Sequence, residues 1–164
     1  LVHRSIADAF IARFVERARR IRIGDPMDPA TELGPLAFAG HLERVLGYID
    51  VARQDGATLL TGGRRASGFD RGYYLEPTAV LARDNASRVC QEEIFGPFAT
   101  FLVYASVDEA IAMANATPFG LVAYVWAGDV DVVMRATRDL RAGTVWVNTT
   151  MVRELRAPFG GYKQ

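Results

Sequence analysis

Short segments typical of β-strands alternate with longer amphipathic segments along most of this chain. Strands are predicted at residues 57–61, 74–81, 98–104, 121–127 and 144–147, where β-branched and aromatic residues gather. Helices are predicted from residue 6 to before Gly24, over 37–54, over 106–115 and from residue 130 to before Gly143. The alternation predicts an α/β fold, with a mostly parallel sheet flanked by helices. We expect the strands near Ala57, Phe98, Leu121 and Thr144 to share that one sheet.

Three polar residues are expected to cap helices. Ser5 followed by Asp8 resembles a capping box, in which a hydroxyl and an acidic side chain satisfy the first amide groups of a helix. Ser106 followed by Glu109 has the same spacing, and Asp129 stands directly before another helical segment.

Composition excludes several classes of function. The chain of 164 residues is long enough for one domain with a substantial core, and we expect a single domain over residues 1–164.

The 19 basic and 19 acidic residues balance, so the chain has no net charge that would attract nucleic acid or an anionic membrane as a partner. The apolar stretches are too short for a transmembrane helix. One cysteine and two histidines exclude a disulfide framework and a Cys/His zinc site, so no metal site is expected, and His3 and His41 are interpreted as structural.

Both ends of the chain look interrupted. Leu1-Val2-His3 resembles the end of a strand that began earlier and has none of the features of a signal peptide. The last six residues, 159–164, lie within a glycine-containing loop. We therefore expect a piece of a longer protein, and the single thiol is compatible with a reducing compartment such as the cytoplasm.

Cys90 is the one candidate nucleophile of the cysteine type. Its neighbours, Ser87-Arg88-Val89 and Gln91, include no histidine that could act as its base. Unpaired cysteine usually behaves as a small buried hydrophobe, so we interpret Cys90 as a structural thiol. The chain also contains no complete glycine-rich loop of the kinds that cradle phosphates.

Two adjacent carboxylates, Glu92 and Glu93, precede Ile94-Phe95-Gly96-Pro97. Neighbouring side chains point in different directions, so the pair cannot converge as a catalytic dyad. One of them could still enter a cleft and accept hydrogen bonds from two vicinal ribose hydroxyls. Composition alone favours a solvated acidic loop.

Several motifs stand in one order and spacing, and together they resemble the NAD(P)-dependent aldehyde dehydrogenases over essentially the whole chain. They are Gly24-Asp25-Pro26, Gly34-Pro35, the Glu92–Pro97 segment, Thr117-Pro118-Phe119-Gly120-Leu121, Gly143-Thr144-Val145-Trp146-Val147-Asn148 and Pro158-Phe159-Gly160-Gly161-Tyr162-Lys163. Members of that family are about three times longer, with a Rossmann-like coenzyme domain, a catalytic domain and an oligomerisation element. The resemblance implies that this chain is the C-terminal part of the catalytic domain.

The resemblance also implies a mechanism and its limits here. In the family, a cysteine thiolate attacks the aldehyde, hydride passes to the nicotinamide, and water hydrolyses the resulting thioester with help from a general base. The matching cysteine and base glutamate lie outside this chain, as does the coenzyme domain, so no catalytic residue is expected and the isolated chain should be inactive. NAD is favoured over NADP, and a full-length homodimer or homotetramer in the cytoplasm is implied.

Six residues are candidates for binding, and five of them match family positions with such a role. Glu93 matches the residue that holds the nicotinamide ribose, and Phe95 matches one beside the nicotinamide. Asn148, Arg153 and Phe159 lie on the segment that lines the substrate tunnel, although for Phe159 a core aromatic is about equally plausible. Arg156 stands three residues after Arg153 and is the sixth candidate.

The two arginines suggest the substrate. The run Val152-Arg153-Glu154-Leu155-Arg156 resembles the branch of the family that oxidises muconic semialdehydes, such as 5-carboxymethyl-2-hydroxymuconate semialdehyde. These substrates carry carboxylates, which a guanidinium binds through two parallel hydrogen bonds. Two other roles for the arginines stay open: a surface ion pair of Arg156 with Glu154, or two merely solvated side chains. The substrate could also be a betaine or aliphatic aldehyde, and the chain could be a non-catalytic assembly module that has kept the fold.

Overall fold

The computed structural model describes residues 1–152 and 155–163, and the chain divides into two compact units. Residues 2–103 form the larger unit, and Leu1 with the residues from Tyr104 onward forms the smaller one. Each unit carries strands and helices, so the α/β class is confirmed. That residues 1–164 are one domain stays a prediction.

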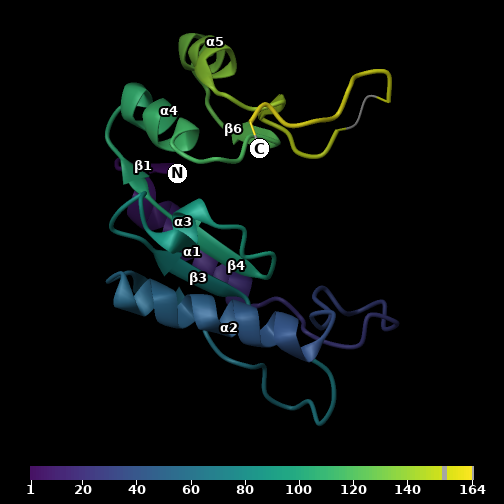
Figure 1. The fold of residues 1–164 in the computed structure, drawn as a ribbon. Coiled ribbons are helices and arrows are strands. Elements are labelled where there is room, and N and C mark those ends of the chain that lie inside the picture. The colour runs from purple at the N-terminus through teal and green to yellow at the C-terminus, as the bar shows by residue number, and fades with distance from the viewer. Residues whose placement is uncertain (153–154, 164) are drawn as a thin grey trace. The chain divides into compact units, whose positions relative to one another are not determined.

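A sheet covered by helices forms the larger unit (Figure 1). Strand β2 (Thr58–Thr61) pairs antiparallel with β3 (Thr78–Leu81), which pairs parallel with β4 (Phe98–Phe101). The remaining elements are β1 (Val2–His3), α1 (Ala7–Arg19), α2 (Ala39–Gln54) and the short helix α3 (Arg88–Gln91). The two-residue strand β5 (Val103–Tyr104) lies where the chain passes from one unit to the other.

Apolar side chains of both long helices are buried against this sheet. Ala7 of α1 belongs to a buried cluster with Ala79 and Phe101, and the ring of Phe14 meets Phe101 edge-on at 4.9 Å. Helix α2 buries a stripe at helical spacing, formed by Leu42, Val45, Ile49 and Ala52. Helices α1 and α2 therefore cover opposite faces of the sheet (Figure 1).

The smaller unit is built on one βαβ element. Strands β6 (Val122–Val125) and β7 (Thr144–Val147) pair in parallel, and α5 (Val130–Asp139) connects them. Helix α4 (Val107–Asn115) contacts α5. On one face of the strand pair the rings of Tyr124 and Trp146 stack at 5.2 Å.

The expectation that four strands share one sheet is wrong. Strands β2 and β4 belong to a three-stranded sheet, whereas β6 and β7 form a separate pair. Strand β2 is moreover antiparallel to β3, because the connection between them, residues 62–77, contains no helix that would carry the chain back for a parallel return. The segment predicted as a strand over 74–81 starts only at Thr78, after Pro77, which has no amide hydrogen for a sheet.

Two of the three expected caps are confirmed. The Ser106 hydroxyl accepts a hydrogen bond from the Glu109 amide at 3.2 Å, and the Asp129 carboxylate accepts from Asp131 and Val132. Ser5 is not a cap, because α1 begins after Ile6 and the Ser5 hydroxyl hydrogen-bonds Nδ1 of His3 at 2.7 Å. Within the described residues, no helix has the length and apolar character needed to cross a membrane.

The two serines offer a matched test of this assignment. We expect Ser106→Ala to lower the free energy of unfolding by about 1 kcal/mol, because it leaves an amide at the helix start without its partner. Ser5→Ala should change it by less than about 0.5 kcal/mol, as for an ordinary surface substitution. Urea denaturation of both variants checks this, and a larger loss for Ser5→Ala would contradict the assignment of the cap.

Candidate functional site

Residues 92–97 form a loop between α3 and β4 in the larger unit. At its far end, the Pro97 carbonyl accepts a hydrogen bond from the Thr78 amide at 2.8 Å, which joins the loop to β3. Ile94 is buried, whereas Glu92, Glu93 and Phe95 are exposed. The loop therefore buries one apolar side chain, Ile94, and exposes its acidic and aromatic residues.

Side chains of α2 hold this loop. The Arg44 guanidinium donates to the Ile94 carbonyl at 3.0 Å, and Nε2 of His41 donates to the Phe95 carbonyl at 2.5 Å. The Tyr48 hydroxyl donates to the Glu92 carboxylate at 2.7 Å. Three and four residues apart along α2, these donors lie on one face of the helix.

Close packing reinforces the attachment. A Cβ atom on Gly96 would lie 2.9 Å from Cγ2 of Val45, a buried residue of α2. The loop backbone thus approaches α2 more closely than any residue with a side chain allows at this position.

The two adjacent glutamates differ in what they contact. Both oxygens of Glu92 accept hydrogen bonds from Arg88, at 2.7 and 3.0 Å, and Tyr48 donates as well. The hydrogen bonds from Arg88 and Tyr48 lower the pKa of Glu92 from its ordinary 4.5 to about 2. The same bond raises the pKa of Tyr48. Among the described residues, the Glu93 carboxylate has no hydrogen-bond or ion-pair partner, so it is available to an incoming ligand.

Phe95 is presented in an unusual way. Its backbone φ is 57°, in the left-handed region that costs a non-glycine residue free energy, and its side chain is 70% exposed. Its ring lies 6.2 Å from that of His41. A large aromatic ring held in the open by a strained backbone is a candidate contact for a flat ligand.

Asn148 has a structural role that the sequence interpretation did not include. It follows β7 with φ of 52°, and its amide group both donates to the Ala127 carbonyl and accepts from the Ala127 amide, at 2.9 and 3.0 Å. Its own backbone amide donates to Val125. Asn148 therefore ties the end of β7 to the chain that leaves β6.

The remaining candidates lie on the C-terminal segment of the smaller unit. Phe159 is 66% exposed, which disfavours a core aromatic, and Arg156 is exposed as well. Arg153 lies outside the described residues. The segment is anchored by Lys163, whose ammonium donates to the carbonyls of Asn115 and Thr117 at 3.1 and 2.8 Å.

Cys90 lacks the environment of a nucleophile. It is half-buried, and its thiol donates to the Asp84 carbonyl at 3.6 Å. Burial, and to a lesser degree the charge of Asp84, raise the pKa of the Cys90 thiol. A raised pKa keeps the sulfur protonated and unreactive.

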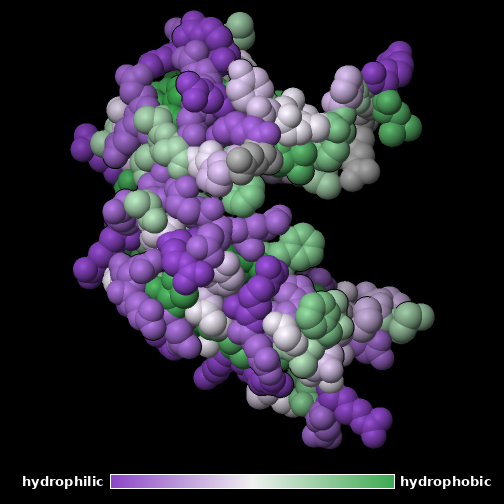
Figure 2. Space-filling model, viewed as in Figure 1, coloured by the Kyte–Doolittle hydropathy of each residue, from purple (hydrophilic) through white to green (hydrophobic). Residues whose placement is uncertain are grey.

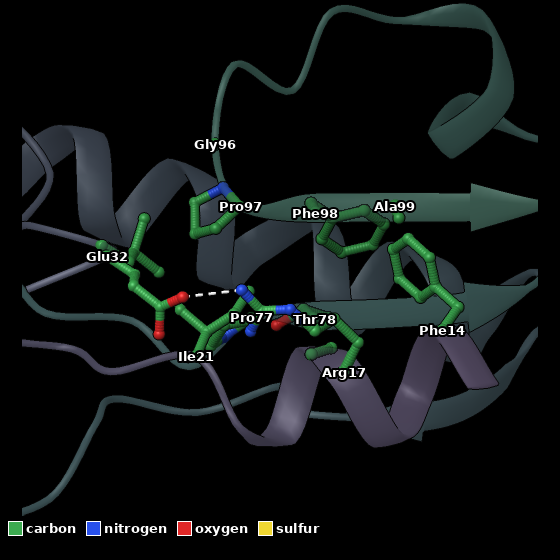
Figure 3. A pocket seen from close by; sticks show the side chains of 12 residues that line it. Phe14, Arg17, Ile21, Glu32, Pro77, Thr78, Gly96, Pro97, Phe98 and Ala99 are labelled. Carbon is green, nitrogen blue, oxygen red and sulfur yellow. Dashed lines mark hydrogen bonds and ion pairs between the residues drawn. The ribbon is translucent and has the colours of Figure 1, made fainter. Parts of the chain in front are cut away.

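A pocket of about 660 Å³ lies between α1 and the start of β4 in the larger unit (Figure 3). Its walls are mostly apolar, with Phe14, Phe98 and Pro97 among them, and Arg17 pairs with Glu32 at 2.6 Å along one side. The pKa of Glu32 is lowered by hydrogen bonds from the Arg22 amide and from Arg17. None of the five predicted site residues that the structure describes, Glu93, Phe95, Asn148, Arg156 and Phe159, lines this pocket.

The surface carries apolar residues in both units (Figure 2).

The sequence interpretation missed His41, Arg44, Tyr48 and Arg88, which hold the loop at residues 92–97. A signal was present, because polar residues 41, 44 and 48 recur at helical spacing within a segment predicted as a helix.

Comparison with known proteins identifies one family. The model of the aldehyde dehydrogenase family matches residues 1–164. Betaine aldehyde dehydrogenase from Brucella anthropi is 43% identical over 165 residues, which cover 99% of this chain and 34% of that protein. The structure of HpcC from Thermus thermophilus is 43% identical, with a TM-score of 0.95, and the match covers 99% of this chain and 32% of that one.

A third relative was solved with a coenzyme. A point variant of betaine aldehyde dehydrogenase from Staphylococcus aureus, in complex with NAD+, is 36% identical, with a TM-score of 0.95 over 99% of this chain and 33% of that one. The chain thus spans about a third of the length of the curated relatives it matches. The family match over all 164 residues, together with the agreement in fold, shows that the chain belongs to the aldehyde dehydrogenase family.

Proposed function

We propose that this chain supplies the ribose-binding loop and part of the substrate site of an NAD(P)-dependent aldehyde dehydrogenase. The observation that carries the proposal is the difference between the two glutamates. Arg88 and Tyr48 donate hydrogen bonds to the Glu92 carboxylate, whereas the Glu93 carboxylate has no partner among the described residues. Family membership supports the activity, and the whole enzyme's reaction is proposed from it.

The residues of the loop fit a nicotinamide nucleoside. An exposed carboxylate can accept hydrogen bonds from two vicinal ribose hydroxyls, which Glu93 is able to do without breaking another contact. The exposed ring of Phe95, two residues on, offers a flat apolar surface to a flat heterocycle. A nicotinamide coenzyme, when bound, supplies a hydride acceptor for the oxidation of an aldehyde. Glu93 and Phe95 would bind and orient it.

We propose a carboxylated, muconic-type semialdehyde as the substrate. Arg156, which is exposed, and Arg153 stand on the segment that also carries Phe159. A guanidinium favours an anionic substrate and disfavours a quaternary ammonium by charge repulsion. Betaine aldehyde is the second candidate, because relatives 43% identical to this chain are betaine aldehyde dehydrogenases.

Further features are proposed from the family resemblance. Both units would belong to one catalytic domain, whose nucleophilic cysteine and base glutamate lie outside this chain. The whole enzyme would be a cytoplasmic homodimer or homotetramer that prefers NAD to NADP. The competing hypothesis of a non-catalytic assembly module needs only the core pattern, and it gives no reason for Glu93 and Phe95 to be exposed on a firmly held loop.

The first prediction of this proposal compares the two glutamates in the full-length enzyme. Glu93→Gln removes the charge and one strong acceptor, and it should raise the KM for the coenzyme about tenfold or slow hydride transfer to a similar degree. Glu92→Gln should raise the coenzyme KM less, by no more than about threefold, since its amide oxygen can still accept from Tyr48 and only the ion pair with Arg88 is lost. Steady-state kinetics decides, and greater damage from Glu92→Gln would reverse the assignment.

The second prediction concerns the substrate. Arg153→Ala should lower kcat/KM about ten- to a hundredfold for a carboxylated semialdehyde, because it removes a charge-assisted hydrogen bond. An uncharged aldehyde of similar length should be affected little, and Arg156→Ala should follow the same pattern more weakly. Equal losses on both substrates, or none on either, would remove the case for a carboxylate-binding site. Activity on betaine aldehyde that exceeds that on the semialdehyde would favour the second candidate.

The third prediction concerns Cys90. Cys90→Ser in the full-length enzyme should leave aldehyde oxidation within a few-fold of the unmodified protein, because the thiol is protonated and has no adjacent base. Loss of activity in Cys90→Ser with an unchanged melting temperature would contradict this assignment.

Residues 1–164 alone should show no aldehyde-dependent reduction of the coenzyme. Turnover by the isolated chain would contradict the proposal that the catalytic residues lie outside it.

A further inference from the structure

Glu92 lies at the centre of a cluster of three polar side chains from two helices and the loop. The Arg88 guanidinium donates to both carboxylate oxygens, and the Tyr48 hydroxyl donates to Oε2 at 2.7 Å. The Arg88 guanidinium carbon also lies 5.8 Å from the centre of the Tyr48 ring. Tyr48 therefore contacts both members of the ion pair.

The two donors have different consequences for the loop. Arg88 lies only four residues before Glu92, and both side chains of this ion pair are exposed. Exposed ion pairs of this kind contribute little to stability. Tyr48 belongs to α2, 44 residues away along the chain, and is half-buried beside the core residue Ile49. The Tyr48 hydroxyl thus joins the start of the loop to an element that the core holds in place.

Fixing Glu92 also determines how Glu93 is presented. Successive side chains of an extended segment point to opposite sides, and Glu92 has φ and ψ of −115° and 150°. While the Glu92 carboxylate is held against Tyr48 and Arg88, the Glu93 carboxylate is directed away from them. Further along, Arg44 and His41 hold the carbonyls of Ile94 and Phe95.

We infer that Tyr48 is a positioning residue for coenzyme binding: through its hydrogen bond to Glu92, it sets the loop so that Glu93 faces the ligand. The inference rests on the proposed role of Glu93. Tyr48 itself does not touch the coenzyme in this scheme, and its contribution is exerted through the loop.

The test separates the hydroxyl of Tyr48 from its ring. In the full-length enzyme, Tyr48→Phe keeps the packing and removes only the donor, and it should raise the KM for the coenzyme about three- to tenfold. The kcat at saturating coenzyme should stay within about twofold. Tyr74→Phe is the matched control, because the Tyr74 ring stacks on Phe69 at 3.9 Å and its hydroxyl has no partner among the described residues; its KM should be unchanged.

The ion pair has a control of the same spacing. Arg88→Ala should raise the coenzyme KM in the same direction as Tyr48→Phe, since it removes the other support of Glu92. Arg20→Ala breaks the exposed pair with Glu16, also four residues apart, and should have no effect on the KM. Hydrogen–deuterium exchange of peptides spanning residues 92–97 should accelerate in Tyr48→Phe and in Arg88→Ala but in neither control.

A double-mutant cycle with Glu93→Gln then identifies the route. If Tyr48 acts through Glu93, Tyr48→Phe adds less than about twofold to the KM once Glu93 is replaced. If the double variant raises the KM by the product of the two single-variant factors, the inference is overturned. If Glu93→Gln raises the coenzyme KM and Tyr48→Phe does not, the inference is overturned while the proposed function stands. If Tyr48→Phe raises the KM and Glu93→Gln does not, the proposed function is overturned, and with it the route through the loop.

Discussion

The loop at residues 92–97 depends on the rotational setting of helix α2. The buried residues Leu42, Val45 and Ile49 and the donors His41, Arg44 and Tyr48 lie side by side on that helix, each donor next to a buried residue in the sequence. Burying the apolar stripe against the sheet fixes how α2 is turned about its axis. The direction of the three donors is then fixed as well. The hydrophobic core of the larger unit thus positions a loop of which it contains only Ile94.

This arrangement explains why the two adjacent glutamates have different contacts. The sequence alone indicates that Glu92 and Glu93 cannot converge, but it does not tell which one is available. Resemblance to the family selects Glu93, and the structure adds a physical reason, because Glu92 is taken by Tyr48 and Arg88. Arg88 is four residues away and would have been found if the short helix α3 had been predicted. Tyr48 is 44 residues away, and only the tertiary fold brings it to the loop.

Local chemistry was predictable where a few neighbouring residues determine the outcome. The caps at Ser106 and Asp129 and the existence of helix α2 follow from spacing within one or two turns. Strand partners were not predictable in this way, because a strand pattern indicates that a segment is extended and not which strand it joins. The helix α5 between β6 and β7 correctly indicated a parallel pair. The helix-free connection from β2 to β3 permitted the antiparallel pairing that the structure contains.

In the smaller unit, three of the family motifs form one hydrogen-bonded assembly. The Gly120 carbonyl accepts from the amides of both Gly143 and Tyr162, and Lys163 donates to Thr117. This places the start of β6, the start of β7 and the C-terminal segment against one another.

The segment with the substrate candidates is therefore held near both of its ends. Asn148 fixes its beginning through Ala127, and the indole of Trp146 donates to the Val152 carbonyl at 2.9 Å. Tyr162 and Lys163 fix its end. Binding residues often lie on loops that a rigid scaffold positions, since such loops can change in sequence without a change of fold. Arg156 and Phe159 stand on this kind of segment, whereas Glu93 stands on a loop that α2 holds at three successive points. The two loops thus differ in how they are held: the loop at residues 92–97 by side chains of one helix, and the C-terminal segment by hydrogen bonds near its two ends.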